Sequence, residues 1–475
     1  MYMEKLFEEW AGNLPTTKIQ VSANGSNRKY FRLSDEIKSC IAAHNDDVRE
    51  NEAFFHFADE LAQRGIAVPE VYAVSEDRTT YLQTDLGNVT LYGYLLSRKN
   101  SGVDVTSETV RLYKKAIDLL IDIQGKCSTV DFSHSYPRPN FDRQAFMWDF
   151  NYFKYYFLKL FGIPFDEQLL ENDFCKLVDY LLDEDCGFFV HRDFQSRNFM
   201  IVNDDLYLID FQGARRGAAQ YDLASLLYSS KADLSIVTRE QLLSYYIERR
   251  TELSDTLFSE HGHFDASLFE NRFYAYVLAR MMQAMGAYGF RGMIEKKDLF
   301  IRSIPVAVNN MRTLMDKYEI PVEIPHLKSV LKSITEMPEY GNNSEVLTVS
   351  VFSFSYKKGI PFDKSGNGGG FVFDCRCLPN PGLYDEYRQL NGRDKAVVDF
   401  FTKHTEVEAF LSYVKSILDF AVKSYKEKGY TRLMVNFGCT GGRHRSVYCA
   451  EQISKFLRDS CDCDVSLHHL EQSKL

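Results

Sequence analysis

The chain has 475 residues, of which 45% are hydrophobic, 14% aromatic and 26% charged, and this composition excludes a globally disordered protein. The length is typical of two or three domains. A formal net charge of -10 disfavours a protein that coats nucleic acid or lies on an anionic membrane. The sequence has no apolar run long enough to span a bilayer, and its first residues lack the pattern of a signal peptide. We therefore expect a cytoplasmic protein without a membrane partner, in which the ten cysteines are reduced.

The first part of the chain begins with strand patterns and continues with helical ones. Its first residues read as a short amphipathic helix. Residues 20–43 then alternate like strands around a turn-forming Asn-Gly-Ser-Asn sequence, and residues 48–65 have helical spacing. Two strand-like segments follow, at residues 66–74 and 79–87. From about residue 107 to 315 the pattern is mainly helical, interrupted by the strands NFMIV and LYLIDF on either side of a polar turn. This order predicts a small strand-rich part and a larger helical part.

A second domain is predicted after residues 326–345, a stretch rich in turn-forming residues that reads as a linker. A β-branched and aromatic strand opens it at residue 346. The strand-like sequence FVFDCRCL, a helix across 394–428, the strand RLMVNFG and a helix from about 443 to 458 follow. Strands that alternate with helices predict a small α/β domain over 346–475. Its Cys375/Cys377 and Cys461/Cys463 pairs lack the usual zinc spacing, so we interpret them as structural thiols.

The sequence HRDFQSRN at 191–198 carries the residue types that phosphoryl transfer needs. Asp193 suits the carboxylate that orients and deprotonates an attacking hydroxyl, and His191 would support the loop. Asn198, five residues after Asp193, and Asp210, at the end of the following hairpin, suit the hard oxygen ligands of Mg²⁺. The combined spacing predicts a kinase active site with Asp193 as catalytic residue and Asn198 and Asp210 as metal ligands.

These residues resemble the aminoglycoside phosphotransferase and choline kinase branch of the protein-kinase-like fold. The segment LIDFQGARRGAAQYDLASLL and the late helix RMMQAMGAYGF are similar to those of its anomeric amino-sugar kinases. The resemblance covers about residues 5–320 and implies a bilobal α+β domain, over residues 1–325, that binds ATP and Mg²⁺. It also implies nucleotide contacts from the loop tip and the interlobe hinge, at Ser26, Asn27, Arg28, Gln83 and Asp85. The implied substrate is N-acetylmuramate or N-acetylglucosamine, phosphorylated on the anomeric hydroxyl in cell-wall sugar recycling.

One departure from kinases concerns the lysine that normally lies on the third strand and contacts the nucleotide phosphates. Here that strand reads SCIAAH, with Ala42 or Ala43 at the lysine position. Glu50 and Glu52 are both candidates for the helix glutamate that would pair with it. Arg28 or Arg32 could supply the missing charge, and the sequence leaves these alternatives open.

The sequence CTGGRHRS at 439–446 has the Cys-x5-Arg-Ser outline of a tyrosine phosphatase loop. It lies between a strand and a helix, where backbone N–H groups form an anion site. A phosphatase would need a general acid, and Asp374 or Asp394 could serve. The alternatives are a phosphate cradle without a nucleophile and a tight structural turn.

The sequences FVFDCRCLPNP, LNGRDKAVVDFFTKHTEVEAFL and GCTGGRHRSV, in this order, resemble the C-terminal domain of the RNase adapter protein RapZ. The resemblance spans about residues 346–470 and implies a site for glucosamine-6-phosphate, so the phosphatase outline would be coincidental. The implied sugar-phosphate contacts are Thr440, Gly441, Gly442, Arg443, His444 and Arg445. The P-loop of the RapZ family is absent, a sugar-site histidine is missing near Gly382, and the tail is less basic, which disfavours RNA as a partner.

Together these features predict an ATP- and Mg²⁺-dependent sugar kinase whose second domain senses an amino-sugar phosphate and regulates the first. The alternative is a non-catalytic regulatory adaptor that binds a sugar phosphate or small RNA. Homo-oligomerisation is left open.

Overall fold

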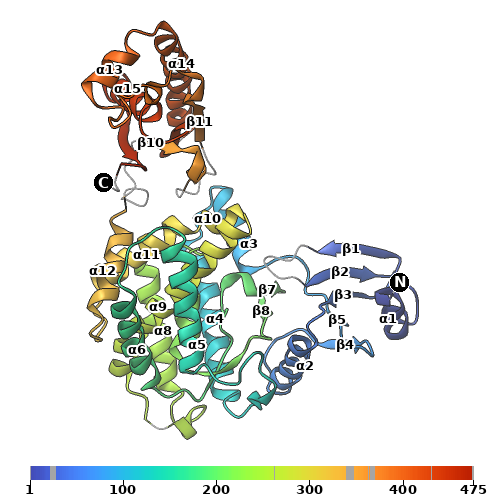
Figure 1. Cartoon of the computed structure of the whole chain (residues 1–475). Helices are drawn as coiled ribbons and strands as arrows, with labels where there is room; N and C mark the ends of the chain where they lie inside the picture. The colour runs from blue at the N-terminus through green and yellow to red at the C-terminus, as the bar shows by residue number, and fades with distance from the viewer. Residues whose placement is uncertain are drawn as a thin grey trace. The chain divides into compact units, whose positions relative to one another are not determined.

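The computed structural model describes residues 2–21, 28–261, 263–337, 347–361, 363, 370–428 and 430–472. They form two compact units, one of residues 1–287 with 310–331 and one of residues 288–309 with 332–475 (Figure 1). The predicted domain limits, 1–325 and 346–475, stay a prediction. No helix among the described residues is long and apolar enough to cross a membrane.

The first unit opens with a five-stranded antiparallel sheet in the order β1-β2-β3-β5-β4. Its strands are β1 (Thr17–Val21), β2 (Lys29–Ser34), β3 (Ser39–His44), β4 (Val71–Val74) and β5 (Thr80–Thr84). Alternation along the strands sends one set of side chains toward helix α1 (Tyr2–Ala11), where Leu33, Cys40, Ala42 and Leu82 pack against Leu6 and Phe7. Residues between them in the sequence therefore face the opposite side of the sheet. Helix α2 (Val48–Gln63) begins at the N-cap Asp47, whose side chain accepts the Glu50 N–H.

The rest of the first unit is mainly helical, as the sequence predicts. Its helices are α3 (Leu91–Asn100), α4 (Thr106–Lys126), α5 (Arg143–Phe153), α6 (Glu167–Leu182), α7 (Gln220–Leu227) and α8 (Ile236–Glu252). Further along the chain, α9 (Ala266–Gly289) belongs to the first unit and α10 (Asp298–Ile301) to the second, while the limits of the units fall within α11 (Ile304–Lys317) and α12 (Pro325–Thr335). Two short antiparallel pairs lie among the helices, β6 (Phe188–Val190) with β9 (Arg215–Gly217) and β7 (Phe199–Val202) with β8 (Asp205–Leu208). The second pair is the predicted NFMIV–LYLIDF hairpin.

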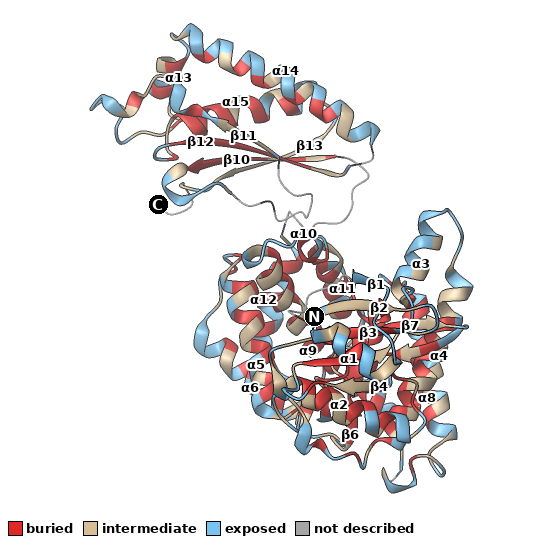
Figure 2. Ribbon diagram, turned by 90° about the vertical axis from the view of Figure 1, so that its right-hand side faces the viewer, coloured by how far each residue is buried: buried red, intermediate tan, exposed pale blue. Residues whose placement is uncertain are grey.

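The second unit contains a four-stranded parallel sheet in the order β11-β12-β10-β13. The strands are β10 (Thr348–Ser355), β11 (Gly370–Asp374), β12 (Arg432–Cys439) and β13 (Asp464–His469). Helices α13 (Lys395–Phe401), α14 (Thr405–Glu427) and α15 (Arg445–Ser460) cover one face, where Val351, Val435 and Phe437 form the centre of the core (Figure 2). The single helix predicted across 394–428 is two helices, because the chain leaves helical geometry at His404 and α14 starts afresh.

Candidate functional site

The loop after β6 is held in place by its own backbone and by α7. The N–H groups of His191 and Arg192 donate to the two carboxylate oxygens of Asp222, at 2.6 and 2.9 Å. Burial raises the pKa of Asp222 to about 6, although His191 and the two N–H bonds oppose this rise. Asp222 was not predicted as a residue that holds this loop. Its signal was the Tyr-Asp-Leu-Ala sequence that opens α7.

His191 connects this loop to the strand pair that carries the predicted metal ligands. Its Nδ1 accepts the Asp193 N–H at 3.2 Å, so its Nε2 carries the proton and donates to the Ile209 carbonyl at 3.0 Å. The supporting role predicted for His191 agrees with these bonds. Asn198 adds a third tie, because its Nδ2 donates to the Asp193 carbonyl at 2.7 Å. The backbone on both sides of Asp193 is thereby positioned before any substrate binds.

The Asp193 carboxylate is 44% exposed and contacts Arg280 of α9, with 2.9 Å between Oδ1 and Nη2. Burial opposes its ionisation, but Arg280, Arg197 and Arg192 outweigh burial and lower its pKa to about 2. The group is therefore ionised at neutral pH and can accept a hydrogen bond from a hydroxyl.

Asn198 is joined by a backbone hydrogen bond to Ile209, the residue before Asp210. Asn198 ends a short 3-10 helix, and the Ile209 N–H donates to its carbonyl at 3.0 Å. Asp210 follows β8 with a φ of 68°, a conformation that non-glycine residues adopt mainly at special sites. Gln212 Nε2 donates to Asp210 Oδ1 at 2.9 Å. An amide oxygen and a carboxylate are the kinds of oxygen donor that Mg²⁺ binds.

The predicted nucleotide contacts fall into three groups. Ser26 and Asn27 lie outside the described residues. Arg28 is buried, and its guanidinium lies 3.6 Å from Glu50 Oε1. At the hinge, Gln83 Oε1 is a buried acceptor with no hydrogen-bond partner among the described residues. Such an unsatisfied atom fits a ligand that brings a donor, as an adenine amino group would.

Asp85 is held by residues of the neighbouring strands. Its carboxylate accepts Arg32 Nε at 2.7 Å, Arg32 Nη2 at 2.8 Å and the Ser39 hydroxyl at 2.6 Å. The Gly87 N–H also donates to it, at 3.0 Å. These contacts tie the hinge to β2 and β3. Asp85 therefore shapes the hinge, and direct contact with a nucleotide stays a prediction.

A group of arginines next to Asp193, of which Arg215 and Arg280 are buried, was not predicted. Arg192 contacts Asp149 at 3.1 Å, and both Arg215 and Arg280 also lie close enough to lower the pKa of Asp149, which burial raises overall. Arg215 Nη2 is buried without a hydrogen-bond partner among the described residues. Burial and the neighbouring Arg192 lower the pKa of Arg215 to about 9. The signal for Arg280 was present in the RMMQAMG helix, but only folding brings that helix to Asp193.

In the second unit, the loop CTGGRHRS connects β12 to α15. Cys439 is 3% exposed, and its thiol lies 3.2 Å from the Ser446 hydroxyl. The Thr440 carbonyl accepts the Ser355 hydroxyl at 2.8 Å, and Gly442 has a φ of 68°. The backbone thus turns sharply into the N-terminus of α15.

The basic side chains of this loop contact neighbouring backbone. Arg445 Nη1 donates to the carbonyls of Arg376 at 3.1 Å and Leu378 at 3.3 Å, and Arg445 is buried. His444 Nε2 donates to the Tyr387 carbonyl at 2.9 Å. Burial lowers the pKa of His444, so it adds no charge at neutral pH. Arg443 is more exposed and reaches the Arg388 carbonyl at 3.5 Å. An anion at this turn would therefore meet backbone N–H groups, Gly441 and Arg443 more readily than Arg445.

The two aspartates and the thiol that a phosphatase would need all have other contacts in the structure. Asp374 pairs with Arg376, and the Asp394 carboxylate accepts the Asn391 N–H at 2.6 Å. Cys439 points into the core of the unit. The arrangement favours a cradle or a turn over a nucleophilic thiol.

Comparison with known proteins supports the two-part organisation. Residues 19–255 match the model of the phosphotransferase enzyme family, and residues 347–473 match that of the RapZ C-terminal domain. A nucleotide-binding protein of Thermodesulfovibrio yellowstonii is 41% identical over 145 residues, which are 30% of this chain and 48% of that protein. A nucleotide-binding protein of Pseudothermotoga lettingae is 44% identical over 111 residues, 23% of this chain and 38% of that protein. The chain thus spans about half or less of the length of these curated relatives.

Among solved structures, the aminoglycoside phosphotransferase APH(4)-Ia in its apo form is 16% identical, with a TM-score of 0.41, and the match covers 70% of this chain and 98% of that one. A choline/ethanolamine kinase family protein from Mesorhizobium loti is 15% identical, with a TM-score of 0.43 and coverage of 70% and 98%. The predicted α+β kinase-like fold followed by a small α/β domain is confirmed. The chain thus combines a segment that matches the phosphotransferase enzyme family, residues 19–255, with one that matches the RapZ C-terminal domain, residues 347–473.

Proposed function

We propose that the first unit is a sugar kinase that transfers the terminal phosphoryl group of ATP to a hydroxyl of an N-acetylated amino sugar. The observation that carries this proposal is the preorganised loop around Asp193. Its backbone is held by His191, Asp222 and Asn198, and its carboxylate is ionised and partly exposed. A general base needs this combination of fixed position and correct protonation state.

In the proposed reaction, the acceptor hydroxyl donates a hydrogen bond to the Asp193 carboxylate. The hydroxyl oxygen attacks the terminal phosphorus of ATP, its proton moves to Asp193, and ADP leaves. Asn198 and Asp210 would hold Mg²⁺, which neutralises charge on the phosphates when bound. Gln83 would accept a hydrogen bond from the adenine.

The charge around Asp193 favours an acceptor that carries an anion. Arg192, Arg197 and Arg280 act on Asp193, and Arg215 joins Arg192 and Arg280 around Asp149. Four guanidinium groups thus lie around the carboxylates of Asp193 and Asp149. A carboxylate on the sugar would offset part of the excess positive charge. We therefore favour N-acetylmuramate over the neutral N-acetylglucosamine, with the anomeric hydroxyl as acceptor.

For the second unit we propose a sugar-phosphate sensor that binds glucosamine-6-phosphate at the β12–α15 turn and regulates the kinase. Backbone N–H groups at a helix N-terminus suit a phosphate. Arg443 adds charge, and Thr440, which is exposed, adds a hydroxyl.

The test is ATP turnover by the purified full chain across N-acetylmuramate, N-acetylglucosamine, glucosamine and an aminoglycoside, with and without glucosamine-6-phosphate. The expected result is Mg²⁺-dependent ADP release that is greatest with N-acetylmuramate. Tight ATP binding without transfer to any acceptor would favour the regulatory adaptor instead.

A further inference from the structure

The missing lysine position can be assigned from the faces of the first sheet. Ala42 packs with Leu33 and Leu82 against α1, so Ala43 faces the other side. On that side Ala43 lies between Tyr30 of β2 and Tyr81 of β5, which are its direct cross-strand partners. Tyr81 in turn packs on Phe54 of α2, with 5.1 Å between ring centroids. Ala43 therefore occupies the place from which a third-strand lysine would reach the helix glutamate.

Arg28 reaches the same place from the residue just before β2. Its guanidinium interacts with Tyr30 and Tyr81, the two cross-strand partners of Ala43. The Arg28 side chain is only 2% exposed, and its Nη2 lies 3.6 Å from Glu50 Oε1. Its guanidinium also lies 5.8 Å from the centroid of the Phe54 ring. Arg32, the alternative cation, is held by Asp85 in two hydrogen bonds.

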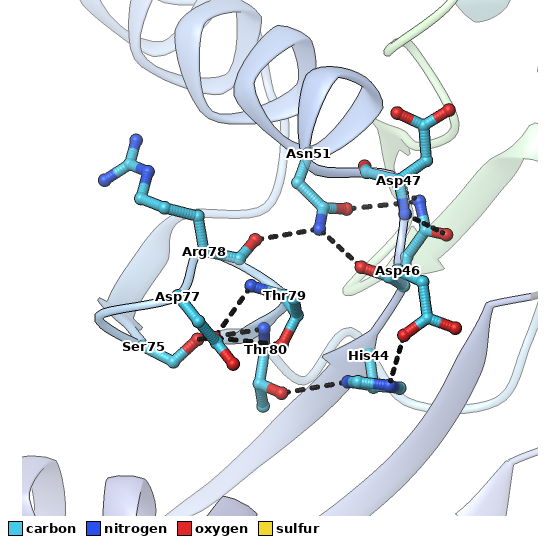
Figure 3. A network of polar contacts seen from close by, with 10 residues as sticks. His44, Asp46, Asp47, Asn51, Ser75, Asp77, Arg78, Thr79 and Thr80 are labelled. Carbon is cyan, nitrogen blue, oxygen red and sulfur yellow. Dashed lines mark hydrogen bonds and ion pairs between the residues drawn. The ribbon is translucent and has the colours of Figure 1, made fainter.

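Of the two candidate glutamates, Glu50 is the one that contacts Arg28. Asn45 Nδ2 donates to Glu50 Oε2 at 2.8 Å. The start of α2 is fixed in turn by Asn51, whose Nδ2 donates to the carbonyls of Asn45 and Arg78, each at 2.9 Å (Figure 3). Glu52 points elsewhere and forms an ion pair with Arg78, in which the side chains are 41% and 45% exposed.

The Arg28–Glu50 pair also lies close to the predicted metal ligand. Tyr30 and Tyr81 both interact electrostatically with Arg28, with Glu50 and with Asp210. The Arg28 guanidinium and the Asp210 carboxylate therefore both lie close enough to these two tyrosines to act on them. Phosphates held near Asp210 would come under the influence of the Arg28 charge.

We infer that Arg28, braced by Glu50, contacts the nucleotide phosphates in place of the third-strand lysine of protein kinases. The small side chain of Ala43 leaves the room that this exchange needs. Arginine offers several donors in a planar fork and suits phosphate oxygens at least as well as lysine. This inference rests on the proposed kinase function and specifies how its nucleotide is held.

The test measures binding of MgAMP-PNP to the full chain by calorimetry and, separately, KM for ATP and kcat. Arg28→Ala should weaken MgAMP-PNP binding by about tenfold to a hundredfold, because one charge-assisted contact is lost. Arg28→Lys should retain part of the affinity. The matched control is Arg78→Ala, which removes the other arginine–glutamate pair on α2 and should bind MgAMP-PNP like the wild type.

The decisive variant removes the positive charge at position 28 and places one at position 43, where protein kinases have their third-strand lysine. Arg28→Ala combined with Ala43→Lys should recover at least tenfold of the lost affinity, because a lysine from Ala43 starts beside Glu50. Circular dichroism identifies variants that fail to fold. If Arg28→Ala is among them, Glu50→Gln provides the same test: it keeps the size of the side chain, removes the charge that braces Arg28, and should raise KM for ATP.

Three results would overturn the inference. They are wild-type affinity in Arg28→Ala, an equal loss in Arg78→Ala, and no recovery in a folded double variant. Wild-type protein that binds MgAMP-PNP but phosphorylates no sugar would refute the proposed function and leave this inference standing.

Discussion

Replacement of Arg280 by glutamine should raise the pKa of Asp193, because Arg280 is the strongest of the three arginines that lower it. Arg280 contacts the Asp193 carboxylate at 2.9 Å, and together with Arg197 and Arg192 it lowers the pKa from 3.8 to about 2 against the effect of burial. That difference corresponds to roughly 2.4 kcal/mol at ~1.36 kcal/mol per pKa unit. Since the Asp193 side chain is 44% exposed, solvent screening reduces the effective interaction to about 1 kcal/mol. We therefore expect the pKa to rise by about one unit.

The assays are an NMR titration of the Asp193 carboxyl carbon and the pH dependence of kcat/KM, which reports the free enzyme. In the wild type the pKa of Asp193 is lower in the folded state than in the unfolded state. The ionised Asp193 therefore stabilises the folded state above the unfolded pKa near 3.8, and this stabilisation is lost as pH falls toward 2. In Arg280→Gln the acid limb of the kcat/KM profile should move to higher pH, because the pKa of Asp193 rises. The matched control is Arg272→Gln, on the same helix, whose guanidinium pairs with Asp183 at 2.8 Å. A titration of Asp193 in Arg280→Gln that coincides with the wild type would refute this account of the site.

Further predictions concern the other site residues. Asp193→Asn should lower kcat by orders of magnitude and leave MgAMP-PNP affinity nearly unchanged; a near-normal kcat would exclude Asp193 as the base. Asp210→Ala should abolish the Mg²⁺ dependence of nucleotide binding in calorimetry, and unchanged MgATP affinity would contradict its role as a ligand. Arg445→Ala should lower the thermal midpoint as well as weaken glucosamine-6-phosphate binding, because the carbonyls of Arg376 and Leu378 lose their donor. Cys439→Ser should leave binding of glucosamine-6-phosphate intact, whereas release of phosphate from an aryl phosphate that depends on Cys439 would revive the phosphatase interpretation.

The sequence by itself determined the features that depend on short-range spacing. Asp193 and Asn198 are five residues apart in one loop, and a tight hairpin returns the chain to Asp210, so these residues stay close in any compact fold. The same holds for the β12–α15 turn, where glycines and a helix start lie next to one another in the chain. Alternation of strands and helices was sufficient to separate an α+β part from a small α/β part.

Only the tertiary structure decided how those local features are completed. Arg280 is 87 residues from Asp193, and no spacing rule brings them together. Glu50 and Glu52 are equivalent in the sequence, but they project from different sides of α2, and the way that α2 packs on the sheet turns Glu50 toward Arg28 and Glu52 toward the surface. The sequence predicts a phosphate contact for Arg445, but in the fold its guanidinium donates to carbonyls 67 and 69 residues away in sequence. A buried charged side chain must form hydrogen bonds with groups near it in the fold, because water is excluded. The tertiary structure determines which groups those are.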